Sequence, residues 1–182
     1  MAINGLTVDR LTGERVKLWP YARGIYARDI LYRLWRVVED HEAASKMFWG
    51  SQDEDILKGD LVSFVKYFDD PGRYLLIVTD LTGDDIAGCI WFDDLMPKFR
   101  AFGSVFMRQK YGGEGSMEAV RMALGYAYTV LEVESVWGVT PWRTAKQLCT
   151  RCGFEDVALL PAFARVNGLC HDVTILRHRR GA

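Results

Sequence analysis

The chain has 182 residues, of which 49% are hydrophobic and 26% are charged, and its formal net charge is −1. This size and balance predict one globular domain with a substantial core, and the near-neutral charge argues against binding to nucleic acid or an anionic membrane. The sequence contains no apolar run long enough to span a membrane and no signal peptide at its start. We therefore expect a cytoplasmic protein whose four cysteines are reduced.

Hydrophobic periodicity and turn residues predict strands and helices in a mixed order. In chain order these are a strand (14–19), two helices (22–44 and 53–68), three strands (74–80, 86–93 and 100–106), a helix (116–131), a strand (135–139), a helix (142–151) and two strands (157–160 and 169–176) separated by a loop (161–168). This order indicates an α+β fold in which about four helices flank a mixed, mostly antiparallel sheet of six or seven strands. One pair of neighbouring strands should be parallel.

The segment 100–131 is the part of the sequence that points most directly to a ligand. It is predicted as a strand, a glycine loop at 110–115 and an amphipathic helix. A helix start offers unpaired backbone N–H groups and a positive dipole end, and glycines let the backbone approach a ligand closely. The unit therefore suits a phosphate or pyrophosphate, although the glycines could also serve only as a tight turn. It matches neither the Walker loop nor the dinucleotide fingerprint.

The glycine loop resembles the coenzyme A loop of the GCN5-related N-acetyltransferase (GNAT) superfamily. The family pattern is Arg/Gln-x-x-Gly-x-Gly/Ala, and this sequence offers Lys110-Tyr-Gly-Gly-Glu-Gly115. An alternative register beginning at Gln109 would place the carboxylate of Glu114 where a small residue is expected, beside a pyrophosphate. We therefore prefer the register that begins at Lys110.

A second segment carries the same resemblance. Many GNAT proteins have Asn-x-x-Ala-x-x-Leu-Tyr-x-x-x-Gly-Phe on their fourth helix. The equivalent frame here is Trp142-x-x-Ala145-x-x-Leu148-Cys149-x-x-x-Gly153-Phe154. Together with the order of the elements, the resemblance extends over about residues 14–177. It implies the GNAT fold and one acyltransferase domain over residues 1–182.

The resemblance also implies an activity, namely transfer of an acetyl group from acetyl-coenzyme A (acetyl-CoA) to the amine of a small-molecule or peptide acceptor. The amine would attack the thioester directly. The pantetheine arm would bind along Val105, Phe106 and Met107. The remaining coenzyme ligands implied by the family are Lys110, Tyr111, Gly112, Gly113, Glu114, Gly115, Ser116 and Trp142. Because GNAT proteins often pair, a homodimer is also expected.

The catalytic groups implied are Cys149, Ser104 and Asp93. Cys149 occupies the position of the tyrosine that commonly protonates the leaving thiolate, and it could equally be a small buried residue. Ser104 could order a water molecule, and Asp93 ends a strand near the expected acceptor. Trp142 replaces the usual asparagine, where it could stack on adenine or fill the gap between two strands.

Three alternative readings of the sequence remain open. The acidic stretch 52–55 could attract a cationic acceptor or simply begin a helix. Cys149, Cys152, Cys170 and His171 have zinc-ligand chemistry, but Cys170 and His171 are neighbours on a predicted strand and would point to opposite faces. Finally, the missing asparagine and tyrosine would fit a GNAT-like binding or assembly module without catalysis, as in some phage-encoded proteins.

Overall fold

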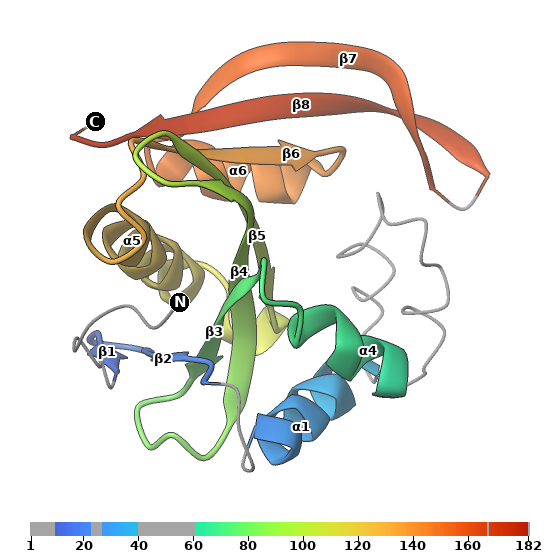
Figure 1. Ribbon diagram of the computed structural model, residues 1–182. Helices are drawn as coiled ribbons and strands as arrows, with labels where there is room; N and C mark the ends of the chain where they lie inside the picture. The colour runs from blue at the N-terminus through green and yellow to red at the C-terminus, as the bar shows by residue number, and fades with distance from the viewer. Residues whose placement is uncertain (1–9, 23–26, 40–60, 167, 182) are drawn as a thin grey trace.

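The computed structural model describes residues 10–22, 27–39, 61–166 and 168–181 (Figure 1). The acidic stretch 52–55 therefore lies outside the described residues, as do the ends of the first predicted helix and the first half of the second. The helices that the structure describes are α1 (Ala27–Glu39), α4 (Leu61–Phe68), α5 (Glu114–Thr129) and α6 (Arg143–Arg151), with a short 3-10 turn, η1 (Gln109–Tyr111).

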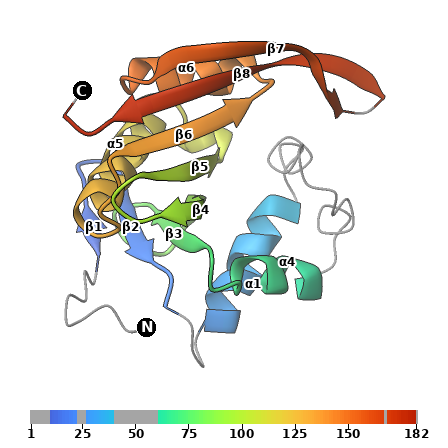
Figure 2. The ribbon, with the colours of Figure 1, turned by 45° about the horizontal axis from the view of Figure 1, so that its top comes forward.

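The strands form a single sheet with the order β1-β2-β3-β4-β5-β6-β8-β7, which Figure 2 shows side by side. Their bounds are β1 (Leu11–Thr12), β2 (Lys17–Pro20), β3 (Tyr74–Thr79), β4 (Ile86–Met96), β5 (Arg100–Met107), β6 (Ser135–Thr140), β7 (Glu155–Val166) and β8 (Leu169–Arg179). Every neighbouring pair is antiparallel except β5 and β6, which confirms the predicted parallel step. The α+β prediction is also confirmed. The sheet has eight strands rather than six or seven, because the two-residue β1 adds an edge to β2.

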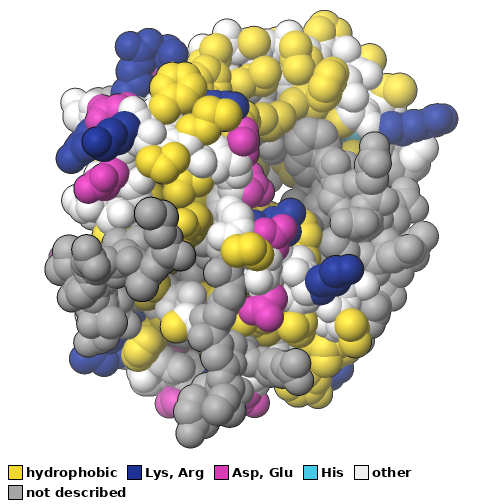
Figure 3. All heavy atoms as spheres, viewed as in Figure 1, with side chains coloured by type: hydrophobic (Ala, Val, Ile, Leu, Met, Phe, Trp, Pro, Cys, Tyr) yellow, Lys and Arg dark blue, Asp and Glu magenta, His cyan; other side chains and the backbone are white. Residues whose placement is uncertain are grey.

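The predicted loop at 161–168 is wrong, since β7 continues to Val166 and pairs with β8 over nearly its whole length. Pro161 suggested a break in the chain. A proline is tolerated in an edge strand at a bulge, and the β7–β8 register shifts between Leu160 and Ala164. In the two-stranded ribbon formed by β7 and β8, β7 carries exposed apolar side chains at Val157, Leu159 and Phe163. Figure 3 shows hydrophobic side chains gathered at the top of the molecule, where this ribbon lies.

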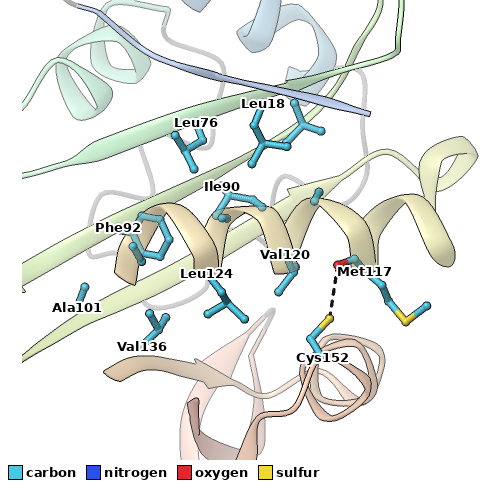
Figure 4. Close-up of a cluster of buried hydrophobic side chains, with 14 of the residues drawn as sticks. Leu18, Leu76, Ile90, Phe92, Ala101, Met117, Val120, Leu124, Val136 and Cys152 are labelled. Atoms are coloured by element: carbon cyan, nitrogen blue, oxygen red, sulfur yellow. Dashed lines mark hydrogen bonds between the residues drawn. The ribbon is translucent and has the colours of Figure 1, made fainter. Parts of the chain in front are cut away.

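Helices cover both faces of the sheet, with α5 and α6 on one face and α1 and α4 on the other (Figure 1). Because side chains alternate between faces along a strand, β4 contributes Ile90 and Phe92 to the α5 side and Cys89 and Trp91 to the α1 and α4 side. Figure 4 shows the core on the α5 side, where Val120 and Leu124 of the helix lie against strand residues.

A carboxylate on α5 holds the start of the sheet in place. Glu118 accepts hydrogen bonds from the backbone N–H groups of Glu14 (2.6 Å), Arg15 (2.8 Å) and Val16 (3.1 Å). Gly13 leaves the room for this contact, because a Cβ there would lie 2.5 Å from the Glu118 carboxyl carbon. The chain that leads into β2 is thereby fastened to the helix that follows the glycine loop.

The parallel pairing between β5 and β6 is short. It joins Arg100 to Ser135, Ala101 to Val136 and Phe102 to Trp137. Within the described residues the ladder ends there, although β5 continues to Met107 and β6 to Thr140. From Phe102 onward the two strands diverge, and the sheet has an opening bordered by the second half of each strand. We call this opening the splay.

Candidate functional site

The splay exposes backbone groups of β5. The N–H of Arg108 donates to the carbonyl oxygen of Ala87, 2.8 Å away on the β4 side. Since N–H and C=O groups alternate direction along a strand, those of Val105 and Met107 point away from β4 and into the splay. No described residue pairs with them. Phe106 has the opposite orientation, and its side chain is buried against α1 and α4.

A cleft of about 890 Å³ opens on the α5 and α6 side of the splay. Val105 and Met107 of β5, Gly113 and Ser116 at the start of α5, and the outer surface of α6 line it. Of the residues predicted to bind the coenzyme, these four share one cavity. The remaining loop residues lie beside them in sequence.

The predicted loop at 110–115 is shorter than expected. Residues 109–111 form η1, and α5 begins at Glu114 rather than Ser116, with Gly113 as its N-cap. Gly113 has φ +67°, a conformation that glycine adopts without strain, and a carboxylate in the first helical turn is favoured by the helix dipole. The predicted helix start is therefore wrong by two residues.

This helix start offers unpaired donors. The first backbone bond into α5 runs from the N–H of Met117 to the carbonyl oxygen of Gly113, at 3.1 Å. The N–H groups of Gly113, Glu114, Gly115 and Ser116 have no acceptor among the described residues. The Ser116 hydroxyl donates to the Tyr111 carbonyl at 3.2 Å and so holds the turn closed. Four successive donors at a helix start are a good arrangement for an anion.

Asp85, at the start of the adjacent strand β4, holds this turn in place. Its carboxylate accepts hydrogen bonds from Lys110, from the Tyr111 hydroxyl (2.7 Å) and from Arg108 (2.6 Å). The bond from Lys110, together with the other two, lowers the pKa of Asp85 to about 2. Burial and the bond to Asp85 raise the pKa of Tyr111 to about 12. The side chains of Lys110 and Tyr111 therefore fix the loop, leaving its backbone to face a ligand.

Sequence reasoning missed Asp85, which lies just before the predicted strand at 86–93 and belongs to no predicted element. The available signal was the cluster of Arg108, Lys110 and Tyr111 just before the glycines, which needs an acidic partner.

Basic side chains of α6 line the outer part of the cleft. Lys146 is paired with Asp156, and Arg151 lies 3.4 Å from Glu114. Arg143 lines the same cleft, and no described carboxylate lies within ion-pair distance of it. This wall therefore carries positive charge that is only partly neutralised, which favours an anionic ligand.

Cys149 lies on the inner side of α6 and lines a smaller apolar pocket between the helix and the splay. Burial, with a smaller contribution from Cys152, raises the pKa of its thiol to about 12. Trp142 is not among the residues that line either space. It caps α6, and its ring lies 5.4 Å from that of His171 on β8.

The side chains of Ser104 and Asp93 lie on the opposite face of the sheet from the cleft, although the backbone of Ser104 borders the apolar pocket. Ser104 is opposite Trp91, and Asp93 is opposite Phe102, so all four side chains share the face covered by α4. Diagonal neighbours of this kind lie roughly 7–8 Å apart between Cα atoms. Since Phe102 makes the last pair with β6, the two predicted catalytic side chains lie at the closed end of the splay.

Burial raises the pKa of Asp93 above its usual range, while Arg73 and Trp91 act in the opposite direction. Arg73 lies over the ring of Tyr67 on α4, 3.6 Å from its centroid. Figure 3 shows acidic and basic side chains close together near the middle of the view. The structure thus provides a cleft on one face of the splay and charged groups on the other.

The structure gives no support to the hypothesis of a zinc site. Among the described residues, no three His, Cys, Asp or Glu side chains are close enough to hold a metal ion. The Cys152 thiol is buried 3.8 Å from the Met117 carbonyl oxygen, whereas Cys170 is exposed on β8. None of the helices in the described part of the chain has both the length and the apolar composition needed to cross a membrane.

No protein-family model and no curated protein sequence matches this chain. Solved structures match it along nearly its whole length. Spermidine N-acetyltransferase from Vibrio cholerae, in complex with CoA and spermine, matches with a TM-score of 0.71 and 17% identity, covering 92% of this chain and 96% of that one.

Two further structures have the same fold. Ribosomal-protein-S5-alanine acetyltransferase from Vibrio fischeri matches with a TM-score of 0.70 and 13% identity, covering 94% of this chain and 97% of that one. A probable acetyltransferase of the GNAT family from Chromobacterium violaceum matches with a TM-score of 0.72 and 17% identity, covering 94% and 86%. The chain therefore has the fold of the GNAT acetyltransferases, as the sequence predicted.

Proposed function

We propose that this protein is an N-acetyltransferase that transfers an acetyl group from acetyl-CoA to an amine. The observation that carries the proposal is the position of the four unpaired N–H groups of residues 113–116, beside a sheet that opens between β5 and β6. A ligand that fills both features needs an anionic group at one end and an extended, hydrogen-bonding arm at the other. The diphosphate and pantetheine of coenzyme A have this combination.

The coenzyme would enter from the α5 and α6 side. Its diphosphate would bind at Gly113, Glu114, Gly115 and Ser116, with Gly112 in the turn before them. Arg143 and its basic neighbours on α6 add favourable charge. The pantetheine amides would pair with the free backbone groups of Val105 and Met107. Phe106 would then contribute by packing in the core, which keeps β5 straight.

The amine would approach from the α4 side, where Asp93 and Ser104 lie. Its nitrogen attacks the thioester carbonyl, the C–S bond breaks, and the amine proton passes to Asp93 directly or through water held by Ser104. Backbone N–H groups on the open edge of β5 are available to stabilise the oxyanion. The raised pKa of Asp93 brings this carboxylate closer to the range in which a general base works at neutral pH.

Cys149 is the weakest of the proposed catalytic groups. A thiol whose pKa is about 12 is a poor proton donor to a thiolate whose conjugate acid has a pKa near 8.5. We propose instead that the leaving thiolate takes its proton from water in the cleft. The main role of Cys149 would then be to line the apolar pocket.

The acceptor would be a small molecule or a peptide with a free amine. The spermidine N-acetyltransferase of V. cholerae, whose structure contains spermine, has the same fold. A cytoplasmic location and a homodimer remain predictions, which cell fractionation and light scattering would test.

The proposal is tested with the purified protein in two steps. Acetyl-CoA should raise the melting temperature, and a panel of polyamines, amino acids and peptides with free N-termini should cause release of free thiol from acetyl-CoA. Stabilisation without thiol release for any amine would instead indicate a binding module. Absence of stabilisation at saturating acetyl-CoA would overturn the proposal.

A further inference from the structure

We propose that the acyl site of this protein accepts chains longer than acetyl, with propionyl and butyryl as the expected range. The inference rests on the proposed function and concerns the inner end of the same site. It is carried by an apolar pocket that begins where the coenzyme cleft ends.

The pocket lies at the splay, on the α5 and α6 side. Val105 lines both this pocket and the coenzyme cleft, so the two spaces adjoin at the point where the pantetheine arm would end. Gly103 and Gly138 line it from the two diverging strands, just beyond the last parallel pair. A thioester held along β5 would therefore direct its acyl chain toward this pocket.

The lining suits a hydrocarbon chain. Phe92, Val120, Leu124, Val136 and Phe154 surround the pocket with carbon atoms, and the Cys149 thiol stays neutral at physiological pH because burial raises its pKa. Its free volume is about 40 Å³. A single water-sized group needs roughly 10–15 Å³ counted in this way, so about three such groups fit. An acetyl methyl would leave part of the pocket empty, whereas one or two more methylene groups would fill it.

Two glycines, Gly103 and Gly138, keep the pocket open, and they differ in how much room each leaves for an added Cβ. A Cβ added to Gly103 would lie 3.1 Å from Val136 Cγ1 and 3.3 Å from Phe92 Cε1, so these two side chains would have to shift. A Cβ added to Gly138 would have the Gly103 carbonyl oxygen as its nearest neighbour, at 3.9 Å. Gly138 also has no positive φ. Alanine at this position therefore fits the backbone and occupies volume that an acyl chain would otherwise use.

The chemical step is unchanged by chain length. The amine nitrogen forms a bond to the acyl carbon, the C–S bond breaks, the sulfur leaves with the electron pair as coenzyme A thiolate, and the amine loses one proton to the base. No oxidant or further reactant is needed. The products are a longer N-acyl amide and free coenzyme A.

The test compares acetyl-, propionyl- and butyryl-CoA with one amine acceptor, in the wild-type protein and in Gly138→Ala. In the wild type, kcat/KM for propionyl-CoA should equal or exceed that for acetyl-CoA, and propionyl-CoA should raise the melting temperature more than free CoA does. In Gly138→Ala the ratio of propionyl to acetyl kcat/KM should fall at least tenfold, since one methylene group in an apolar pocket changes discrimination by 10–200-fold.

The matched control is Gly125→Ala, another glycine-to-alanine change. Gly125 lies on α5 with nothing within 4 Å of its added Cβ, and it lines neither pocket. This variant should leave the propionyl-to-acetyl ratio at the wild-type value. A ratio below one in the wild type, or an equal ratio in the wild type and Gly138→Ala, would overturn the inference alone. Failure to bind any CoA thioester would overturn the proposed function as well.

Discussion

The two faces of the sheet beside the splay are built from different parts of the chain. On the α5 and α6 face, the features suited to a ligand are backbone groups and small residues, such as Gly113 and the open edge of β5 at Val105. On the α1 and α4 face they are side chains, with Asp93, Tyr67 and Arg73 gathered around Trp91. Backbone recognition depends only on chain conformation, whereas side-chain recognition depends on which residues evolution has placed there.

The two kinds of site suit different tasks, namely binding a coenzyme that every reaction shares and selecting one particular acceptor. A backbone site holds the constant part of a coenzyme, and many side-chain substitutions leave it intact. A side-chain site selects one acceptor and activates it. The following variants test whether the two faces divide binding and catalysis in this way, from the largest expected effect to the smallest.

Replacing Asp93 with asparagine should lower kcat by about 10²–10⁴-fold, because the amide cannot accept the amine proton. The dissociation constant for acetyl-CoA should change little, since Asp93 lies on the other face. Steady-state kinetics and coenzyme titration measure the two quantities. In the wild type, the acidic limb of the rate profile should lie above the usual range of an aspartate, because the pKa of Asp93 is raised and only the ionised form is a base.

Asp94 provides the matched control for this variant. Its carboxylate is exposed and pairs with Arg100 at 3.0 Å, so Asp94→Asn should retain nearly the full rate. Equal kcat values for Asp93→Asn and Asp94→Asn would show that Asp93 is not the base.

Replacing Gly113 with glutamate should weaken acetyl-CoA binding about a hundredfold, or about 2.8 kcal/mol at 1.4 kcal/mol per tenfold. The new carboxylate would lie where the diphosphate is expected, and like charges repel. Gly168→Glu is the control, because Gly168 also has a positive φ, +81°, but lies in the β7–β8 turn. Calorimetric titration with acetyl-CoA measures the affinity of both variants. Similar affinities would show that the diphosphate binds elsewhere.

Replacing Asp85 with asparagine should weaken coenzyme binding several-fold, because the turn at residues 109–112 would lose its acceptor for Lys110 and Arg108. The folded state should lose roughly 1 kcal/mol, since this carboxylate is more than a third exposed and solvent weakens its interactions. Asp84→Asn, one residue away, is the control. Urea unfolding and coenzyme titration measure both effects, and an unchanged affinity would mean that the loop does not need this anchor.

The wild type and Asp85→Asn also provide a test of the pH dependence of stability. The folded-state pKa of Asp85 is lowered from 3.8 to about 2, so its stabilising contribution is complete above pH 3.8 and disappears as the pH falls through about 2. The stability difference between the wild type and Asp85→Asn should therefore be constant near neutrality and should shrink between about pH 4 and pH 2.

Replacing Cys149 with alanine should have the smallest effect, a change in kcat of less than about threefold. The thiol is a weak acid in this pocket, so its loss removes little proton transfer. A fall of a hundredfold, with Cys152→Ala unchanged, would instead establish Cys149 as the proton donor.

The α5 and α6 face of the sheet could be predicted from the sequence to a large extent. The glycines at 112, 113 and 115 and the stripe on α5 are local patterns, the parallel step follows from the order of the elements, and the structure confirms the fold that they imply. The strand β1 and the length of β7 could not be predicted, because short edge pairing and a proline bulge depend on the neighbouring strand. The role of Asp85 was hidden because its three partners lie 23 to 26 residues later in the chain. The grouping of Asp93 with Ser104 required the β4–β5 register.

The three-residue ladder between β5 and β6 has a further consequence. It leaves the second halves of β5 and β6 unpaired with each other, so a bound pantetheine arm would act as a partial strand and pair with the open edge of β5. Amide hydrogen exchange at Val105 and Met107 should therefore slow when coenzyme binds, while exchange at Phe106, whose amide faces β4, should hardly change. In that case the substrate would be a structural element of the fold, present only during turnover.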